Sequence, residues 1–400
     1  MPVWLWILYA IAAVGVTAVA GLIGARFKRS LSAAPLPLDP PAVSVIVPAR
    51  NEERNIGRCV LGLIQQRYPC LEIIFVDDDS TDSTPDIVAG YVRQDSRIRV
   101  VRTEPRPADW NGKQWACYTG AQSSTGSWLC FMDADTYAEP DLIERTMAFA
   151  LEKQVGMLSL QPWYEMVGLW ERIVMPAALT HLFLLFPPNW VNDPGRKTVV
   201  ANGQFILLSR AVYDEIDGHR GVRSRMMDDY SLAENVQAAG HRVFIADGAE
   251  VMRVRMYRNL KEMWLGGRKA AIQLTGGWMV SIAGMIGYVL LNILPWFLFV
   301  WAMITGNRVA IVAMGSVVCV EIIFTAVARV WGFRAPPWSA ITYPVGGLLI
   351  FAIGLESMFS VALGREIRWK DRPVLGAPEP SIPQLGFSPL RRKRRTESSR

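Results

Sequence analysis

The chain has 400 residues, enough for one large folded domain together with membrane segments. Its hydrophobic content of 51% and its 15 tryptophans are high for a purely soluble protein, and the apolar residues gather near the N-terminus and after Gly276. The charge of +6 comes with no recognition motif, so we expect no nucleic-acid partner, and the scattered cysteines and histidines argue against a disulfide framework and a zinc site.

The N-terminal segment predicts a transmembrane anchor over residues 1–29. Val3 to Ala25 carries no charge and is long enough for a spanning helix of about 20 residues. Three basic residues follow it between positions 26 and 29, and it lacks the basic start and short apolar core of a signal peptide. We therefore expect an uncleaved anchor with its basic end in the cytosol, followed by a proline-containing linker over residues 30–41.

Residues 42–272 show an α/β pattern. Short apolar runs suited to buried parallel strands alternate with helical patterns, which predicts βαβ units and a mostly parallel sheet. Asn51 is expected to cap the first helix, and Thr84-Pro85 to begin the second, where proline loses no hydrogen bond. The predicted strands are residues 43–47, 71–76, 98–101 and 128–132, and the predicted helices include residues 54–66, 114–123 and 231–239.

The C-terminal part predicts transmembrane helices within residues 273–364. Its three apolar stretches are residues 276–306, 309–330 and 338–363. Carboxylates within the later two, Glu321 and Glu356, are costly in a membrane, so we expect each to have a partner, with a structural pair to an arginine favoured over acceptor binding.

The tail over residues 365–400 is rich in proline and basic residues and is expected to be disordered. Its run of five basic residues, 391–395, is suited to anionic lipid headgroups. An anchor plus three later spans would place this basic tail outside, against the positive-inside tendency, so the sequence leaves the number of spans open.

An apolar segment between the two halves of the α/β pattern contains two adjacent prolines and His181. If it crossed the membrane, it would separate the acidic motifs described next. We therefore predict an interfacial helix over about residues 168–190, lying along the membrane surface.

Two acidic motifs directly follow predicted strands. The run Asp77-Asp78-Asp79 lies where parallel strands face a ligand crevice, and its oxygens suit ribose hydroxyls and base N–H groups, although a solvated turn with a helix cap would give the same pattern. Asp133 and Asp135 repel one another unless a cation compensates, and hard oxygen ligands favour Mg²⁺ or Mn²⁺ bridging a diphosphate.

Two further motifs open helices. Asp228-Asp229 is consistent with ordinary helix-dipole partners, or with a carboxylate that deprotonates an acceptor hydroxyl. Lys113, in the sequence Trp110-Asn111-Gly112-Lys113, is either an exposed loop lysine or a phosphate ligand beside a helix N-terminus.

These motifs, together with the run from Val45 to Glu52, resemble family 2 glycosyltransferases of the GT-A fold over roughly Ala42 to Gln273. Within that family the chain looks most like ceramide glucosyltransferase-like and hopanoid- or carotenoid-associated lipid glycosyltransferases, to which the Arg368-Trp369-Lys370 run is also similar. The resemblance implies a GT-A catalytic domain over residues 42–272.

The resemblance also implies roles for individual residues. Asp229 matches the catalytic base, Asp135 the principal metal ligand, and Asp133 a ligand of ribose and metal. The residues implied to contact the nucleotide-sugar are Pro48, Ala49, Arg50, Glu52, Asp77, Asp79, Lys113, Asp133, Gly203, Gln204 and Arg268.

The family's QxxRW motif is degenerate in this chain. In the nearest match, residues 265–269, Arg268 is present but the glutamine and tryptophan are not. Because this motif helps processive synthases to hold a growing polymer, its loss favours transfer of a single sugar.

We therefore expect inverting, nonprocessive transfer from a nucleotide-sugar, in our reading a UDP-sugar, to a lipid hydroxyl acceptor, with Mg²⁺ or Mn²⁺ as cofactor. The expected location is a bacterial cytoplasmic membrane, with the catalytic domain in the cytosol. The alternatives are a processive polysaccharide synthase, a catalytically inactive membrane scaffold, and an anchored nucleotidyltransferase.

Overall fold

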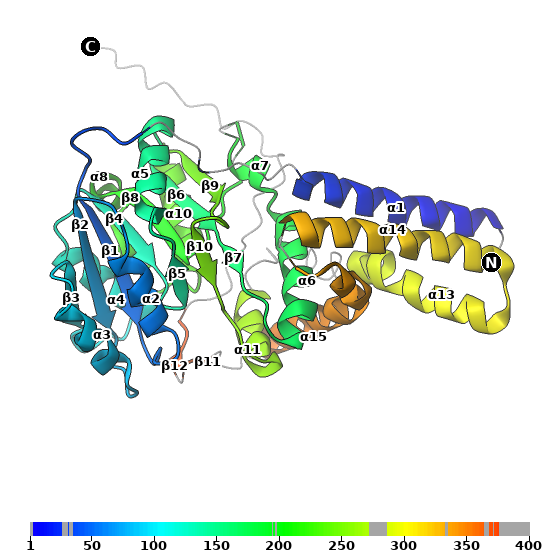
Figure 1. The fold of residues 1–400 in the computed structure, drawn as a ribbon. Helices are drawn as coiled ribbons and strands as arrows, with labels where there is room; N and C mark the ends of the chain where they lie inside the picture. Colours follow the sequence, from blue (N-terminus) through cyan, green and yellow to red (C-terminus); the bar gives the residue numbers. More distant parts are fainter. Residues whose placement is uncertain are drawn as a thin grey trace, which may run out of the picture.

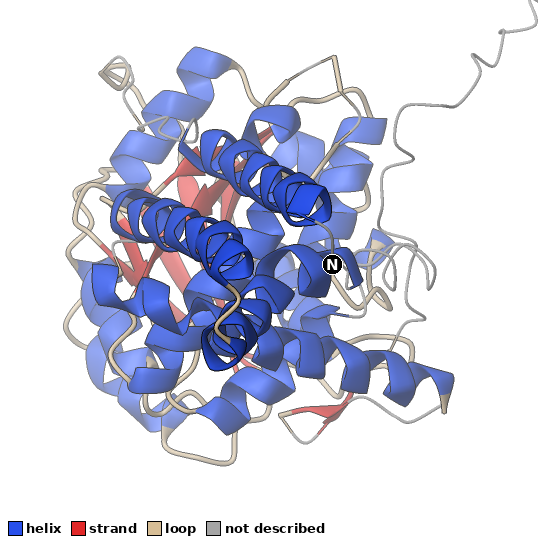
Figure 2. Ribbon diagram, turned by 90° about the vertical axis from the view of Figure 1, so that its right-hand side faces the viewer, coloured by secondary structure: helices blue, strands red, loops and turns tan. Residues whose placement is uncertain are grey.

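The computed structural model describes residues 3–25, 31, 35–193, 195–196, 198–271, 286–332, 335–363, 368–370 and 372–375. Figure 1 shows two parts: a domain built on a twisted sheet, and a group of long helices that extends away from one side of it. Figure 2 looks along those helices toward the sheet.

The main sheet has seven strands in the order β3-β2-β1-β4-β8-β6-β9. β8 runs antiparallel to its neighbours β4 and β6, and the other pairs are parallel, so the predicted mostly parallel α/β sheet is confirmed. The bounds are β1 Val43–Ala49, β2 Leu71–Asp77, β3 Ile98–Arg102, β4 Trp128–Met132, β6 Met157–Gln161, β8 Phe205–Ser209 and β9 Val243–Asp247.

Helices cover both faces of this sheet, which explains why its central strands are apolar at nearly every position. In β1, Val45 and Val47 point into one core and Ile46 into the other. The covering helices are α2 Ile56–Ile64, α3 Thr84–Val92, α4 Gly112–Ser123, α5 Leu142–Lys153, α8 Arg210–Glu215, α9 Gly218–Gly221 and α10 Asp228–Ala238.

The predicted cap of the first helix is wrong. Asn51 lies in the left-handed region with φ 51°, and its Oδ1 accepts from the backbone N–H of Thr81 at 2.9 Å. The residue at the N-cap of α2 is Asn55 instead. The side chain of Asn51 therefore joins the loops that follow β1 and β2, which favours the sharp turn that the backbone makes there.

A smaller three-stranded sheet, in the order β5-β10-β7, links the main sheet to the helical part. Its strands are β5 Thr136–Ala138, β10 Met252–Val254 and β7 Trp163–Tyr164. The chain then enters α6, Leu169–Leu185, and α7, Pro188–Val191. In Figure 1, α6 lies between the sheets and the long helices and runs across their direction.

The helical part contains two segments that are long and apolar enough to cross a membrane, Arg308–Val327 and Pro337–Ser360. They coincide with two of the predicted C-terminal spans. The third, 276–306, lies partly outside the described residues. The elements here are α11 Leu260–Ala271, η1 Val289–Ile293, α13 Leu294–Thr305, α14 Arg308–Gly332, η2 Pro337–Thr342 and α15 Tyr343–Ala362.

The N-terminal segment forms the helix α1, Val3–Ala25, beside α14 (Figure 1). Trp6 and Ala13 of α1 are buried with Met314 and Val317 of α14. The part of α1 whose side chains are described includes one apolar stretch, Trp4–Gly15, and this stretch is shorter than a helix that spans a membrane. Length alone therefore does not establish the predicted anchor.

Each of the two carboxylates within the helical part has a hydrogen-bond partner, as expected, but only one of the described partners is an arginine. Glu356 of α15 accepts from Arg268 at 3.1 Å and from the Trp264 indole, both of α11. Glu321 of α14 accepts from the Trp296 indole of α13 at 2.7 Å. Glu356 thus has the arginine pair that the sequence favoured, whereas the described partner of Glu321 is a tryptophan.

The chain returns to the sheet domain after α15, where disorder was expected. β11 (Arg368–Trp369) pairs antiparallel with β12 (Arg372–Pro373). We call residues 368–370 and 372–375 the C-terminal strap. The strap is held by contacts with residues more than 290 positions earlier in the chain. Local composition contains no sign of such contacts, and it therefore predicts disorder for this segment.

Candidate active site

The strands that precede the acidic motifs end at one edge of the main sheet. Ala49 of β1 pairs with Asp77 of β2, and β4, which ends at Met132, adjoins β1 on its other side. The backbone N–H of Asp78 donates to the Ala49 carbonyl at 2.9 Å. The residues that follow these strands therefore share one rim, as parallel topology requires.

Arg50 holds the loop after β2 in place. Its guanidinium donates to the backbone carbonyls of Asp78 and Asp79, each at 2.7 Å. Asp77 accepts from the N–H of Ser80 at 3.1 Å and therefore closes the turn itself. Asp79 has φ 58° and leaves 71% of its side chain exposed, so its carboxylate is accessible to a ligand.

The C-terminal strap crosses this same rim. Arg372 donates to Asp78 at 2.7 Å and to Asp79 at 3.2 Å. Lys370 forms an ion pair with Glu52 and donates to the Arg50 carbonyl at 2.7 Å. Burial outweighs the charge of Arg372 and raises the pKa of Asp78.

One cation joins the two other acidic motifs. The Lys113 ammonium lies 2.6 Å from Asp133 Oδ1 and 3.9 Å from Asp228 Oδ2. Although burial opposes it, the charges of these two carboxylates raise the pKa of Lys113 well above its usual value. Lys113 also donates to the Gly203 carbonyl at 3.4 Å, so α4, β4, β8 and α10 meet at this residue.

Asp135 differs from Asp133 in having an oxygen with no partner. Its Oδ1 is buried without a hydrogen bond, which is costly for a carboxylate. Burial, and then the charges of Asp133 and Glu52, raise the pKa of Asp135 to about 8. A hard cation at this oxygen would relieve both penalties, so the residues fit a divalent metal.

No complete metal cage accompanies this oxygen. Among the described residues, no group of three or more His, Cys, Asp or Glu side chains is placed to hold a metal ion. A metal here would need further ligands from water or from a bound molecule, which is typical of Mg²⁺ in phosphate sites.

Asp229 lies in the first turn of α10, and both of its oxygens accept from backbone N–H groups. Gly203 donates to Oδ2 at 2.9 Å and Tyr230 to Oδ1 at 2.8 Å. Burial, and then the charge of Asp228, raise the pKa of Asp229 to about 6. This carboxylate is therefore oriented, ionised at neutral pH and more basic than an ordinary aspartate.

The loop before β8 can approach Asp229 because it contains a glycine. A Cβ at Gly203 would lie 3.1 Å from Asp229 Oδ2 and 3.2 Å from the Lys113 ammonium. The neighbouring Gln204 is buried, and its side chain accepts from Asn202 at 3.2 Å, while its carbonyl accepts from the Asp133 N–H. Both predicted residues thus lie at the junction of the Asp133 and Asp229 corners.

Arg268 is the predicted site residue that the structure places elsewhere. Its guanidinium pairs with Glu356 of α15 rather than with the carboxylates of the rim. The adjacent Lys269 is close enough to Asp228 and Asp229 to feel their charges, but burial dominates and lowers its pKa.

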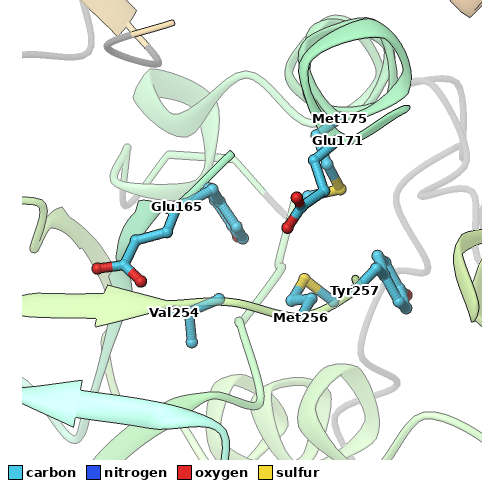
Figure 3. A pocket seen from close by; sticks show the side chains of 7 residues that line it. Glu165, Glu171, Met175, Val254, Met256 and Tyr257 are labelled. Atoms are coloured by element: carbon cyan, nitrogen blue, oxygen red, sulfur yellow. The ribbon is translucent and has the colours of Figure 1, made fainter. Parts of the chain in front are cut away.

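A pocket adjoins the site between the small sheet and α6. Figure 3 shows Glu171 and Met175 of α6 facing Val254 and Met256 across it. Tyr164, another lining residue, accepts from Asn202 at 3.0 Å and so connects the pocket to the loop that carries Gly203. The lining side chains are Tyr164, Glu165, Glu171, Met175, Val254, Met256 and Tyr257.

The structure adds four residues that the sequence did not assign to the site: Asp78, Asp228, Lys370 and Arg372. Asp78 and Asp228 lie within the acidic motifs, so their types were visible and only their orientation was unknown. Lys370 belongs to the run 368–370, whose resemblance to the lipid glycosyltransferases was noted without a role for any of its residues. Nothing local pointed to Arg372.

Comparison with known proteins gives consistent results. Residues 44–217 match the model of glycosyl transferase family 2. A 4,4'-diaponeurosporenoate glycosyltransferase of Staphylococcus aureus (strain USA300) is 27% identical over 245 residues, which cover 59% of this chain and 63% of that relative. The protein of the same name from strain MRSA252 is 28% identical over 280 residues, 65% of this chain and 72% of that one.

A solved structure shares the fold. Mannosyltransferase PcManGT from Pyrobaculum calidifontis, in complex with GDP-Man and Mn²⁺, superposes with a TM-score of 0.54 at 18% identity, covering 89% of this chain and 99% of that one. The expected GT-A-like α/β fold is thereby confirmed.

Proposed function

Because the chain carries a family 2 glycosyltransferase domain over residues 44–217, we propose that it transfers one sugar from a nucleotide-sugar to a lipid hydroxyl, with inversion. The observation that carries this proposal is the convergence of three carboxylate corners, represented by Asp78, Asp133 and Asp229, on one rim. Lys113 lies between the second and third corners, and Arg50 holds the first.

The corner after β2 is suited to the nucleoside part of the donor. The exposed Asp79 carboxylate can accept hydrogen bonds from ribose hydroxyls or base N–H groups. Pro48 and Ala49 end the strand beneath it and would form the floor of this pocket. Asp77, which closes its own turn, would support the pocket rather than contact the nucleotide.

The corner after β4 is suited to the diphosphate. Asp135, with its partnerless oxygen, would be the principal ligand of Mg²⁺ or Mn²⁺, and Asp133 would assist while paired with Lys113. The bound metal would supply stabilisation for the negative charge that develops on the departing nucleoside diphosphate. Lys113, beside the N-terminus of α4, would add to it.

Asp229 is our proposed base. The acceptor oxygen bonds to the anomeric carbon as the bond from that carbon to the diphosphate oxygen breaks, and the hydroxyl proton passes to Asp229. A single displacement from the face opposite the leaving group inverts the anomeric centre. The family match ends at residue 217, so this assignment depends on geometry: the two backbone N–H groups that orient the carboxylate and its raised pKa.

A lipid acceptor is supported by three observations. The relatives in Staphylococcus aureus are named for a carotenoid-derived acceptor, and two helices of this chain are apolar and long enough to span a membrane. The helix α6 lies between the sheets and the long helices (Figure 1), and it begins with the exposed apolar side chains of Leu169 and Trp170. We propose that α6 lies in the interface and α1 anchors the chain beside α14, with the sheet domain in the cytosol of a bacterial cell.

Transfer to lipid is tested with the full-length chain in lipid nanodiscs, Mn²⁺, and a panel of radiolabelled UDP- and GDP-sugars. Mass spectrometry of the lipids identifies the product, and the Asp229→Asn variant is the control. A labelled lipid of one fixed mass supports the proposal. A series of products of increasing length would instead establish a processive synthase. If the lipids carry no label and the chain binds no nucleotide, the scaffold alternative is favoured.

A further inference from the structure

The C-terminal strap places two cations beside the acidic rim at the ends of β1, β2 and β4. Without the strap, the rim holds the carboxylates of Glu52, Asp78, Asp79, Asp133 and Asp135; the cations close enough to act on them are Arg50, Arg106, Lys113 and Lys269. A nucleoside diphosphate adds further negative charge. The divalent metal proposed above would offset charge at Asp133 and Asp135, and further cations would offset the charge that remains along the rim.

The strap is fastened to the loop that leads into α4. Asn111 makes a reciprocal pair with the backbone of Leu375, accepting from its N–H at 2.7 Å and donating to its carbonyl at 3.3 Å. A Cβ at Gly112 would lie 2.6 Å from Asp78 Oδ2 and 3.3 Å from an Arg372 nitrogen. Asn111 and Gly112 thus explain two positions of the Trp-Asn-Gly-Lys motif: Asn111 fastens the strap, and Gly112 leaves room first for the Asp78 carboxylate and then for the Arg372 guanidinium paired with it.

The two cations stand in different places along the rim. Lys370 lies between Glu52 and the corner after β4, near enough for its charge to act on Asp135. Arg372 lies at the corner after β2 and bridges Asp78 and Asp79. If the donor binds as proposed above, Lys370 faces the diphosphate and Arg372 faces the nucleoside.

We propose that the C-terminal strap completes the donor site, with Lys370 as a ligand of the diphosphate and Arg372 as a positioning residue that orients Asp78 and Asp79 toward the nucleoside. This inference deepens the proposed function and rests on it. On donor binding Lys370 exchanges part of its pairing with Glu52 for the phosphate oxygens, with which a lysine pairs as a point charge.

The test is calorimetric binding of UDP, GDP and the corresponding nucleoside monophosphates to the full-length chain in nanodiscs with Mn²⁺. Lys370→Met is expected to weaken diphosphate binding at least about tenfold and monophosphate binding less, since one charge-assisted contact is lost. Arg372→Met is expected to weaken both ligands alike. Lys153→Met, which removes an exposed cation at the end of α5, is the matched control.

A second variant separates loss of the contact from loss of the fold. Asn111→Ala releases Leu375, together with the Arg225 carbonyl, without altering either cation, and it is expected to weaken diphosphate binding in the same direction. Unchanged affinity in Lys370→Met and Asn111→Ala, with wild-type binding intact, overturns the strap proposal alone. Tighter binding in either variant would identify the strap as an inhibitory plug and overturn it too. No nucleotide binding by the wild-type chain would overturn the proposed function as well.

Discussion

Lys113 lies 2.6 Å from Asp133 and is the cation through which the corner after β4 meets the first turn of α10. Two sequence motifs that are more than 90 residues apart are thereby joined at one ammonium group. Each of our predictions about the site depends on which carboxylates this cation compensates and which it does not.

Replacing Lys113 by Met is expected to destabilise the fold by about 1–3 kcal/mol, because Asp133 and Asp228 then lose a shared partner. We expect less than for a fully buried pair, since the side chains of Lys113 and Asp133 are 33% and 28% exposed. The melting temperature of the chain in detergent measures this effect. Mn²⁺ with a nucleoside diphosphate should restore part of it, and an unchanged melting temperature would show that water already compensates the carboxylates.

Asp229→Asn is expected to reduce kcat by about 10²–10⁴-fold while the affinity for the nucleotide stays within about twofold. The amide keeps the shape of the side chain and can still accept from Gly203, but it cannot take a proton. Single-turnover kinetics and nucleotide titration on the same preparation separate the two effects. Near-normal turnover would remove Asp229 from the role of base and would favour a carboxylate acceptor, which has no proton to lose.

The pH dependence follows from the same group. Burial and Asp228 raise the pKa of Asp229 to about 6, so its basic form is dominant at pH 7 and is lost as the pH falls through 6. At saturating Mn²⁺, where metal binding at Asp135 does not limit the rate, we expect kcat/KM to be level above pH 7 and to fall about tenfold per unit well below pH 6. A profile of kcat/KM from pH 5 to 8 measures this. The residual activity of Asp229→Asn should lack the acid limb, and a level wild-type profile would contradict the assignment.

Asp135→Asn is expected to weaken Mn²⁺-dependent nucleotide binding at least about tenfold, because an amide is a poorer ligand for a hard cation than a carboxylate. The binding that remains in EDTA should be equal in the variant and the wild-type chain. Titration of a nucleoside diphosphate with and without Mn²⁺ measures both. Equal metal dependence in the variant would transfer the principal role to Asp133.

Arg255→Met is expected to loosen α6 from the small sheet. Arg255 donates to Glu171 at 3.0 and 3.3 Å, and only 2% of the Glu171 side chain is exposed. Removing one partner of a buried ion pair lowers the free energy of unfolding by about 3–5 kcal/mol. Because a quarter of the Arg255 side chain is exposed, we expect a loss at the lower end of this range. Thermal unfolding measures the loss. The double variant with Glu171→Gln should recover part of it, and additive losses would argue against the pair.

The strands β1, β2 and β4 could be predicted because burial on both faces makes them nearly continuous apolar runs, whereas the edge strand β3 is mostly exposed and shows only a short apolar pattern. β6, β8 and β9 are also buried and five residues long, and an apolar run of that length does not by itself distinguish a strand from a buried helix. β4 has the same length but is followed directly by the acidic motif at Asp133 and Asp135, which marks a strand end. The antiparallel direction of β8 has no local signature. The strands of the small sheet have two or three residues, too few for any periodicity.

The carboxylates after β2 and β4 could be predicted because parallel strands bring their ends together, and Arg50 and Lys113 because they lie in local motifs, whereas the cations of the strap could not. Arg372 and Asp78 are 294 positions apart, and their contact depends on how the chain returns after α15. Arg268 shows the converse: its place in a degenerate motif suggested a phosphate ligand, but the structure pairs it with Glu356. Its predicted contact with the donor stays a prediction.

The position of the C-terminal strap in the chain has a consequence for biosynthesis. A ribosome translates the strands of both larger sheets and the two helices that are long enough to span a membrane before it reaches Lys370 and Arg372. Until then the rim carries its carboxylates without these two cations. The nascent protein therefore acquires these two charges at the rim only after the apolar helices have been made.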